Sequence, residues 1–257
     1  MEKDEVTLLK SREILRVLTF NIHNGINRYG KYNLEQIADF VFQIKPDLAG
    51  LQEVSRFWSP KTKYQDMVGF LGKKLGMYPA FFGAVNRNNK SSFGNLLLSK
   101  WRPIKHWTET LPGELEKRSF IVVQVGVGGA RVNFSTTHLG LSASERLVQV
   151  SKIVDIGLQL GAPLIITGDF NETSNGPGVE IIKRNWIKHK PFPPLGTVRL
   201  KNGKIGPEID MVFTSSDLVL KNLKVYENEL SDHLPVCGDF EIKTPWNQVA
   251  GGPVYVM

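Results

Sequence analysis

Two segments of the chain follow the same order of strand, helix and strand, and few folds accommodate such a repeat. The first segment covers residues 15–53 and the second covers residues 131–172. Polar side chains stand at the ends of their strands: Asn21, Glu53, His138, Asp169 and Asn171. A strand–helix–strand unit implies locally parallel strands, and ligands bind at the carboxyl ends of strands in open α/β sheets. The repeat therefore predicts an α/β fold with a site at one edge of its sheets.

Apolar residues at helical spacing occupy the middle of both segments. They are Leu34, Ile37, Ala38, Val41 and Phe42 in the first segment, and Leu147, Val150, Val154 and Leu158 in the second. We expect Asn33 to cap the first helix. Ser142 and Glu145 match a capping box for the second helix, and Gly161 is expected to end it.

Further strands are expected at residues 92–101, 119–127 and 206–216. With the repeat, they predict two packed mixed β-sheets flanked by helices. No linker or low-complexity stretch divides the chain, so we expect one domain over residues 1–257, with its core at about residues 15–242.

The segment "IITGDFNET" changes from apolar to polar within a few residues. Because alternate residues of a strand point the same way, we expect Asp169 and Asn171 to share a face and Phe170 to enter the core. Two other segments add polar groups at strand ends: Asp210 in "IDMVF", and Asp232 with His233 in "SDHLPV".

The collected set consists of carboxylates, amides and histidines, without a cysteine pair or a serine nucleophile motif. Such oxygens are hard ligands suited to Mg²⁺ or Mn²⁺, and a histidine beside a carboxylate can act as a general base. Together they suit hydrolysis at phosphorus. Each residue alone also fits a structural role, as a turn cap, a solvated strand end or a hydrogen-bonded core histidine. Their joint occurrence at strand ends favours the functional interpretation.

Seven short motifs occur along the chain: "LTFNIHNG", "LQEV", "GNLLLSK", "THLG", "GDFNE", "IDMVF" and "SDHLPV". In this order they resemble the endonuclease/exonuclease/phosphatase superfamily. Its members include exonuclease III, abasic-site endonucleases, pancreatic deoxyribonuclease, neutral sphingomyelinases and inositol polyphosphate phosphatases. The resemblance covers about residues 15–242. It implies a four-layer α/β sandwich and Mg²⁺-dependent cleavage of phosphate esters.

The resemblance also implies roles for five residues on the metal and water side of the site. Asn21 and Glu53 resemble metal-site residues, and Asp232 resembles a second carboxylate on the metal side. Asp169 resembles the group that orients the attacking water. Asn171 resembles a ligand of the phosphate or of the water.

Four more residues are implied on the phosphate side. His233 resembles a general base or a phosphate-contacting histidine, held by Asp210. His138 resembles a histidine that contacts the phosphate or the leaving group. Arg118 falls where the family often places a phosphate-binding arginine, and a surface arginine is the alternative.

The sequence departs from some branches of the superfamily. Glu208 and Met211 flank the "ID" motif, where the family often has an aromatic or basic residue. Abasic-site endonucleases and exonuclease III usually lack a histidine where His138 stands. This histidine, followed by "ASERLVQ", is more similar to the deoxyribonuclease, sphingomyelinase, deadenylase and tyrosyl-DNA phosphodiesterase branches.

The substrate is predicted from charge and loops. The formal net charge is +7, which favours an anionic partner. Several segments expected to be loops combine cations with aromatic rings, which suits nucleic acid: Arg56, Trp58, Lys61, Lys63, Tyr64, Arg87, Lys90, Arg184, Trp186, Lys188, Lys190, Arg199, Lys201 and Lys204. We therefore expect a Mg²⁺-dependent nuclease acting on DNA or RNA.

Three alternatives stay open at this stage. A phospholipid or sphingomyelin-type phosphodiesterase would insert Trp186, Phe192 and Leu195 into an anionic membrane surface. A phosphatase acting on a small soluble phosphate is the second. A non-enzymatic binding module is disfavoured because the catalytic set is complete.

The sequence contains one cysteine, Cys237, in a strand-like stretch that favours a buried structural thiol. No apolar run is long enough to span a bilayer, and the N-terminal segment lacks an apolar signal core. We therefore expect a cytoplasmic protein. The sequence does not identify a protein partner.

Overall fold

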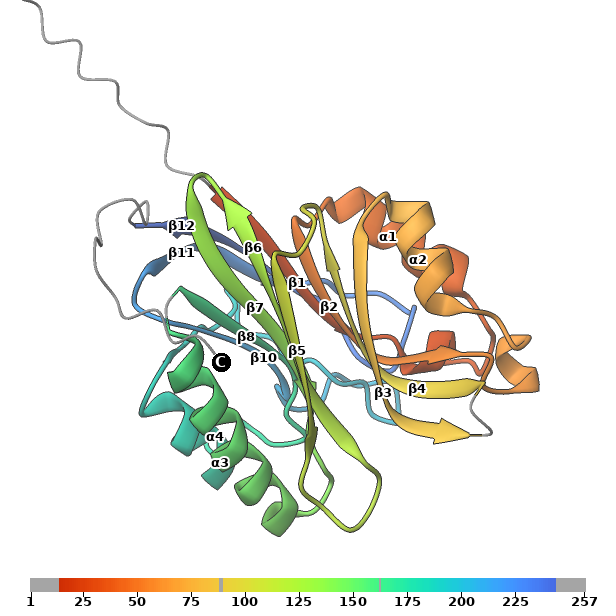
Figure 1. Cartoon of the computed structure of the whole chain (residues 1–257). Helices are drawn as coiled ribbons and strands as arrows, with labels where there is room; N and C mark the ends of the chain where they lie inside the picture. Colours follow the sequence, from red (N-terminus) through yellow and green to blue (C-terminus); the bar gives the residue numbers. More distant parts are fainter. Residues whose placement is uncertain (1–13, 88–89, 162, 244–257) are drawn as a thin grey trace, which may run out of the picture.

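The structure is a computed structural model that describes residues 14–87, 90–161 and 163–243, and its strands form two six-stranded sheets (Figure 1). The first sheet has the order β11-β12-β1-β2-β4-β3, with β1 Ile14–Asn21, β2 Leu48–Arg56, β3 Tyr78–Arg87, β4 Ser91–Ser99, β11 Leu218–Val225 and β12 Val236–Ile242. The second has the order β5-β6-β7-β8-β10-β9, with β5 Lys105–Leu111, β6 Arg118–Val127, β7 Ala130–His138, β8 Leu164–Asp169, β9 Ile187–Lys188 and β10 Asp210–Thr214.

Helices cover the outer faces of both sheets (Figure 1). On the first sheet lie α1 (Leu34–Ile44) and α2 (Met67–Leu75), and on the second lie α3 (Ala143–Leu160) and α4 (Pro177–Lys183). Two short 3₁₀ helices, η1 (His23–Gly25) and η2 (Pro60–Thr62), lie in loops. Both sheets are mixed, since β1 pairs parallel with β2 and β7 pairs parallel with β8. The predicted four-layer α/β sandwich, two packed mixed sheets flanked by helices, is confirmed.

The interface between the sheets changes from apolar to polar along the strands. Inward-facing residues run from apolar to polar in two central strands: Val17, Thr19 and Asn21 on β1, and Ile165, Thr167 and Asp169 on β8. The sheets approach closely midway, where a Cβ on Gly50 would lie 2.8 Å from Thr167 Oγ1. The packed core therefore ends in a set of functional groups at the carboxyl ends of the parallel strands.

The two predicted helices form, but not with all of the predicted faces. In α1 the buried residues include Leu34, Ile37, Ala38 and Val41, as expected, whereas Phe42 is 60% exposed, so its prediction was wrong. In α3 the buried face is rotated: Gln149, Val150, Ile153 and Gly157 are buried, while Leu158 is 61% exposed. Gly157 faces the sheet because a Cβ there would lie 2.6 Å from the ring of Trp186.

The predicted helix starts are correctly placed, but the capping bonds are different. Asn33 makes no capping bond, and its amide nitrogen donates to Leu230 O at 3.1 Å. Ser142 makes none either, and its hydroxyl bonds to Ser144 Oγ at 2.8 Å. Glu145, the other half of the predicted capping box, accepts hydrogen bonds from the backbone of the β5–β6 loop instead. Gly161 ends α3 with φ 72°, as predicted.

Two other predictions concern single features of the chain. Cys237 is buried in β12, and burial raises the pKa of its thiol to about 12, which fits an unreactive structural cysteine. No described helix is long and apolar enough to cross a membrane. Residues 1–13, which make up most of the segment behind the prediction of no secretory peptide, lie outside the described residues.

Candidate active site

Asp169, the last residue of β8, is the centre of the polar group at the end of the sheets. Its Oδ2 accepts a hydrogen bond from Asn21 Nδ2 at 3.0 Å. The Nε2 atoms of His138 and His233 lie 3.4 and 3.6 Å from the same oxygen. The side chain is 1% exposed, so a carboxylate here depends on these donors. Asp169 thus joins β1, β7 and the segment before β12.

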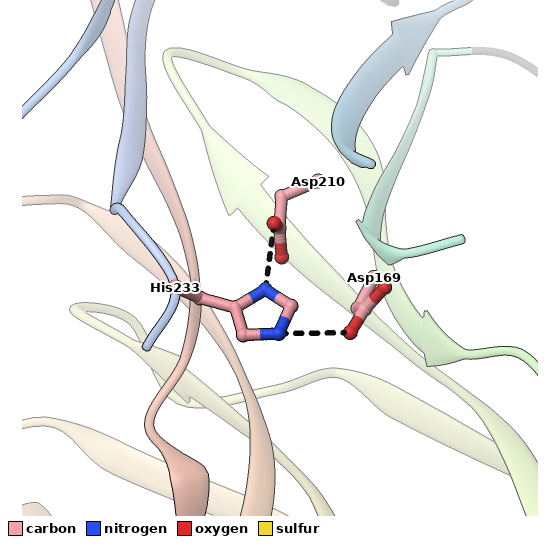
Figure 2. A group of neighbouring side chains, drawn as sticks. All are labelled: Asp169, Asp210 and His233. Atoms are coloured by element: carbon pink, nitrogen blue, oxygen red, sulfur yellow. Dashed lines mark hydrogen bonds and ion pairs between the residues drawn. The ribbon is translucent and has the colours of Figure 1, made fainter. Parts of the chain in front are cut away.

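His233 lies between two carboxylates (Figure 2). Its Nδ1 is 2.8 Å from Asp210 Oδ2, and its Nε2 faces Asp169. Burial lowers the pKa of His233, but Asp210, Asp169 and Asp232 outweigh this effect and raise the pKa to about 10. Near neutral pH the ring is therefore an imidazolium with both nitrogens donating. In this charge state it can donate to a phosphate oxygen but cannot accept a proton.

His138 has the opposite charge state. Burial, aided by the neighbouring Arg118 and His233, lowers the pKa of His138 to about 3. Arg118 Nη1 lies 3.0 Å from His138 Nδ1, and because a guanidinium only donates, Nδ1 is the acceptor. The ring proton is therefore assigned to Nε2, which faces Asp169. Arg118 is 8% exposed and ion-paired with Glu116, so it is not the surface arginine of the alternative interpretation.

Glu53 reaches the site through an irregularity in β2. The pairing of β2 with β4 shifts register between Leu51 and Val54, and Glu53 has φ 57°. A regular strand would place Glu53 on the face opposite to Gln52, against the helices. The β-bulge turns it instead toward Asn21, whose Nδ2 lies 3.2 Å from Glu53 Oε1. A positive φ at a residue other than glycine costs about 1–3 kcal/mol and is often retained at functional sites.

Three groups of the metal side fit a hard divalent cation. Burial raises the pKa of Glu53, and the neighbouring Asp232 adds to this rise. Two carboxylates that repel each other next to an amide are the donor set that Mg²⁺ or Mn²⁺ would stabilise. Asp232 also lies 3.3 Å from His23 Nδ1. Asn21, Glu53 and Asp232 would therefore hold the cation.

A second group could also hold a metal. Within the described residues, Asp169, Asp210 and His233 have ligand atoms that all lie within 4.8 Å of one another. Asp210 Oδ1 is buried and has no hydrogen-bond partner among the described residues. However, a His233 ring protonated on both nitrogens offers no lone pair to a metal and already offsets part of the charge of these carboxylates. We therefore favour the side with Glu53 and Asp232.

Asn171 is close to the site, but its position was predicted for the wrong reason. The strand β8 ends at Asp169, and Asn171 has φ 47°, so strand alternation does not extend to it. Its backbone N–H donates to Asp169 Oδ1 at 2.9 Å, and its amide nitrogen donates to Leu139 O. Phe170 is fully buried, as predicted. Asn171 therefore fixes the carboxylate of Asp169.

Sequence reasoning did not include His23 and Ser231 in the site. His23 lies beside Asp232, and its position two residues after Asn21 in the same motif was an available signal. Ser231 Oγ donates to Asn21 O at 2.8 Å and joins "SDHLPV" to β1, which no local pattern indicates. Glu172, the last acid of "GDFNE", has a structural role: its Oε2 accepts from Val179 N–H at the start of α4.

Comparisons with known proteins agree with the fold of the chain. A sequence model described as the Endonuclease/Exonuclease/phosphatase family matches residues 18–233. No curated protein matches the chain in sequence.

Solved structures resemble the chain over most of its length. An endonuclease/exonuclease/phosphatase from Beutenbergia cavernae DSM 12333 has a TM-score of 0.76 and 22% identity, covering 90% of this chain and 72% of its own. A mannosyl-6-phosphatase from Bacteroides thetaiotaomicron VPI-5482 has a TM-score of 0.72 and 16% identity, and the match covers 88% of this chain and 99% of its own. ANGEL2, a 2′,3′-cyclic phosphatase in complex with adenosine-2′,3′-vanadate, has a TM-score of 0.69 and 13% identity, and the match covers 91% of this chain and 97% of its own. At these identities the likeness establishes the fold.

Proposed function

Because the chain belongs to the endonuclease/exonuclease/phosphatase family, whose members are phosphoester hydrolases, we propose that it is a Mg²⁺- or Mn²⁺-dependent phosphodiesterase that cleaves DNA or RNA. One observation carries the proposal. The Asp210–His233–Asp169 series, with 2.8 and 3.6 Å between its members, lies beside the oxygen donors of Glu53 and Asp232. A charged hydrogen-bond donor, a carboxylate that can orient a water molecule and a set of oxygen ligands for a hard cation therefore lie next to one another.

The residues divide the chemistry of hydrolysis between them. When bound, the cation offsets negative charge on the phosphate. Asp169 orients the attacking water and accepts its proton as the bond from water oxygen to phosphorus forms. His233, protonated and held by Asp210, donates to a non-bridging oxygen. His138, which is neutral, directs its Nε2–H toward the leaving oxygen and stabilises it with a hydrogen bond as the bond from that oxygen to phosphorus breaks, and the leaving oxygen takes its proton from solvent.

Arg118 supports the phosphate side in this proposal. It fixes the tautomer of His138 by donating to Nδ1, and its Nε is buried without a hydrogen-bond partner among the described residues. A buried unpaired donor is costly, and a phosphate oxygen would satisfy it. Asn171 holds Asp169 in place from the opposite side.

The substrate is inferred from charge that is not neutralised within the protein. Arg56, Lys188 and Arg199 form ion pairs with acids, so they are less available to a partner. The exposed Lys61, Lys63, Arg87, Lys201 and Lys204 form no ion pair with a described carboxylate. Five unneutralised cations, four on loops and Arg87 at the end of β3, favour a polyanion over a small phosphate.

The alternatives keep partial support. Trp186 is only 7% exposed and packs against Gly157, so it cannot insert into a membrane as the lipid hypothesis required; Phe192 is 80% exposed. The mannosyl-6-phosphatase similarity favours a small phosphate, whereas the adenosine vanadate bound to ANGEL2 favours a nucleotide. We keep nucleic acid as the proposed substrate and test the others beside it.

A cleavage panel tests the proposal. It contains single- and double-stranded DNA, RNA, an abasic duplex, sphingomyelin vesicles, a simple phosphodiester and a hexose 6-phosphate, each with Mg²⁺, Mn²⁺ or chelator. We expect cleavage of a nucleic acid only with metal, and its loss in Asp169→Asn. Preferred hydrolysis of sphingomyelin or of the sugar phosphate would contradict the nuclease proposal, and full activity in chelator would contradict metal dependence.

A further inference from the structure

We propose that Trp58, Phe93 and Arg87 form a stacking platform for a nucleobase next to the cleaved phosphate. The proposal rests on the proposed function and specifies the substrate further, as nucleic acid with unpaired bases at this position. Its three members come from the β2–η2 loop, from β4 and from the end of β3. They lie far apart in the sequence, so the platform exists only in the folded chain.

The Trp58 ring packs against both of the other planar groups. The centroids of the Trp58 and Phe93 rings are 5.5 Å apart with an interplanar angle of 31°. The guanidinium carbon of Arg87 lies 3.9 Å from the centroid of the Trp58 ring. Aromatic rings and arginine planes are the surfaces on which proteins stack unpaired bases.

The platform begins at the phosphate-binding groups. Phe93 lines the same small hollow as Arg118 and His138, together with Gly94 and Asn95. Asn95 Nδ2 donates to Ser119 O, which fixes β4 against β6 at this point. A phosphodiester held by Arg118 and His138 would therefore carry its neighbouring nucleoside toward Phe93 and Trp58.

The loop that carries Trp58 is held rigidly. Arg56 forms two hydrogen bonds with Asp66, at 2.9 and 3.0 Å. Phe57 N–H donates to Gln65 O, and Ser91 Oγ donates to Phe57 O at 2.7 Å, which ties the loop to β4. A surface that is ordered before binding loses little entropy when a ligand stacks on it.

Charge favours the same occupant. No described carboxylate forms an ion pair with Arg87, and the exposed Lys61 and Lys63 lie on the Trp58 loop, also without such pairs. The cations can contact backbone phosphates while the rings contact bases. Arg87 covers one face of the Trp58 ring, so a base would extend the series from the guanidinium plane or from Phe93. Phe57 and Tyr64 on the same loop are also exposed, so binding to a lipid surface is one outcome that the test distinguishes.

Binding of two single-stranded oligonucleotides of equal length tests the platform. One carries bases and the other is fully abasic, and affinity is measured in chelator by fluorescence anisotropy, so no cleavage occurs. Stacking on one base corresponds to about 5- to 150-fold in affinity. We expect Trp58→Leu to lose an amount in this range for the oligonucleotide with bases and nothing for the abasic one.

Control variants separate stacking from folding. Trp107→Leu, at a 36% exposed tryptophan on β5, should bind both oligonucleotides as wild type does. Arg87→Gln, at an exposed position, should lose some affinity for both oligonucleotides because a cation is removed, but more for the one with bases, and it serves if Trp58→Leu does not fold. Equal losses for both oligonucleotides, or none, would overturn the platform.

The outcome is distinguishable from failure of the proposed function. If the wild-type protein cleaves nucleic acid but neither variant depends on bases, only the platform is wrong. If the wild-type protein neither binds nor cleaves nucleic acid, both proposals are wrong. Loss of binding to anionic vesicles in Trp58→Leu, without loss for oligonucleotides, would assign the surface to lipid and overturn the platform.

Discussion

The imidazole of His233 carries a proton in the free protein because Asp210 and its neighbours outweigh the effect of burial. We predict that His233→Ala loses about 10²–10³ in kcat, the usual loss when one hydrogen-bond donor to the charge of the transition state is removed. Asp210→Asn should lose less, because it disturbs only the charge and orientation of the ring. The double variant should be about as slow as His233→Ala, since residues that act as one unit are not additive. Losses that multiply in steady-state kinetics would show that the two act independently.

The lowered pKa of His138 predicts how the stability of the protein depends on pH. Its folded pKa, about 3, lies below the ordinary value of 6.5, so below pH 6.5 the unfolded chain takes up a proton that the folded protein does not. Stability is therefore lost as pH falls from 6.5 toward 3, by up to ~1.4 kcal/mol per pH unit for this one group. His189, whose pKa burial lowers to about 4, adds a similar share.

Urea unfolding between pH 7 and 4 measures this effect. His138→Gln should lose less stability than wild type as the pH falls, because the His138 contribution is removed. Part of the loss should remain, because His189 still contributes to it. Parallel pH profiles for the two proteins would show that His138 is protonated as readily in the folded as in the unfolded state.

Sequence patterns predicted the residue types of the site better than their geometry. Asn21, His138 and Asp169 were found because they end strands whose apolar pattern is regular. Glu53 was found from its motif, but the bulge that directs it into the site depends on pairing with β4. Asn171 was placed by strand alternation, but the strand ends two residues earlier, at Asp169. The positive φ of Asn171 could not be predicted from the neighbouring residue types.

At the element level, Glu172 links three segments. Its Oε2 accepts from Val179 N–H at the start of α4, and its Oε1 lies 3.4 Å from Arg146 Nε on α3. We predict that Glu172→Ala lowers the free energy of unfolding by about 1–3 kcal/mol, because it leaves buried donors unpaired. Turnover per folded molecule should change little, since Glu172 contacts none of the proposed catalytic groups.

Ser142→Ala provides the matched control for Glu172→Ala. Ser142 makes no capping bond, so its replacement should change stability by less than about 0.5 kcal/mol. Thermal or urea unfolding of both variants checks the pair. A larger loss in Ser142→Ala than in Glu172→Ala would restore the capping box expected from the sequence.

The existence of α1 and α3 was predictable, but the buried face of α3 was not. Its periodicity indicated Leu147 and Leu158, yet Gln149 and Gly157 face inward. Gln149 is buried because its side chain bonds to Gly140 N and Pro112 O, and Gly157 because Trp186 needs its space. Both causes are tertiary contacts, which no helical pattern contains.

At the scale of the whole molecule, the predicted sandwich followed from the repeat of parallel units, but the distribution of charge did not. The net charge of +7 indicates an anionic partner without locating it. Only the folded chain shows that Arg199 is paired with Glu227 while Lys201 is exposed.

This distribution predicts a steep dependence of nucleic-acid binding on salt. Log affinity should fall by ~0.7 per log unit of salt for each single-strand phosphate contact. In wild type we expect log affinity to fall by more than ~2 per log unit of salt, equivalent to about three phosphate contacts. In Lys201→Gln the magnitude of this slope should be smaller by about 0.7, because one contact is lost. Anisotropy titrations at several salt concentrations measure both slopes. A flat response in wild type would remove the electrostatic argument for a polyanionic substrate.

The location of the metal is the point on which the assignment of roles depends. Glu53 and Asp232 offer oxygen ligands on one side of Asp169, while Asp210 and a protonated His233 lie on the other. If the cation binds on the first side, the second side is free to act on protons and phosphate. If it binds on the second side, His233 must be a ligand and the proposed division of roles fails.

Isothermal titration of Mn²⁺ into three substrate-free proteins tests this directly: wild type, Glu53→Gln and His233→Ala. We predict that Glu53→Gln loses most of the Mn²⁺ affinity, whereas His233→Ala binds Mn²⁺ at least as tightly as wild type, because a neighbouring positive charge is removed. Binding that survives in Glu53→Gln and disappears in His233→Ala would place the metal among Asp169, Asp210 and His233 and contradict the account.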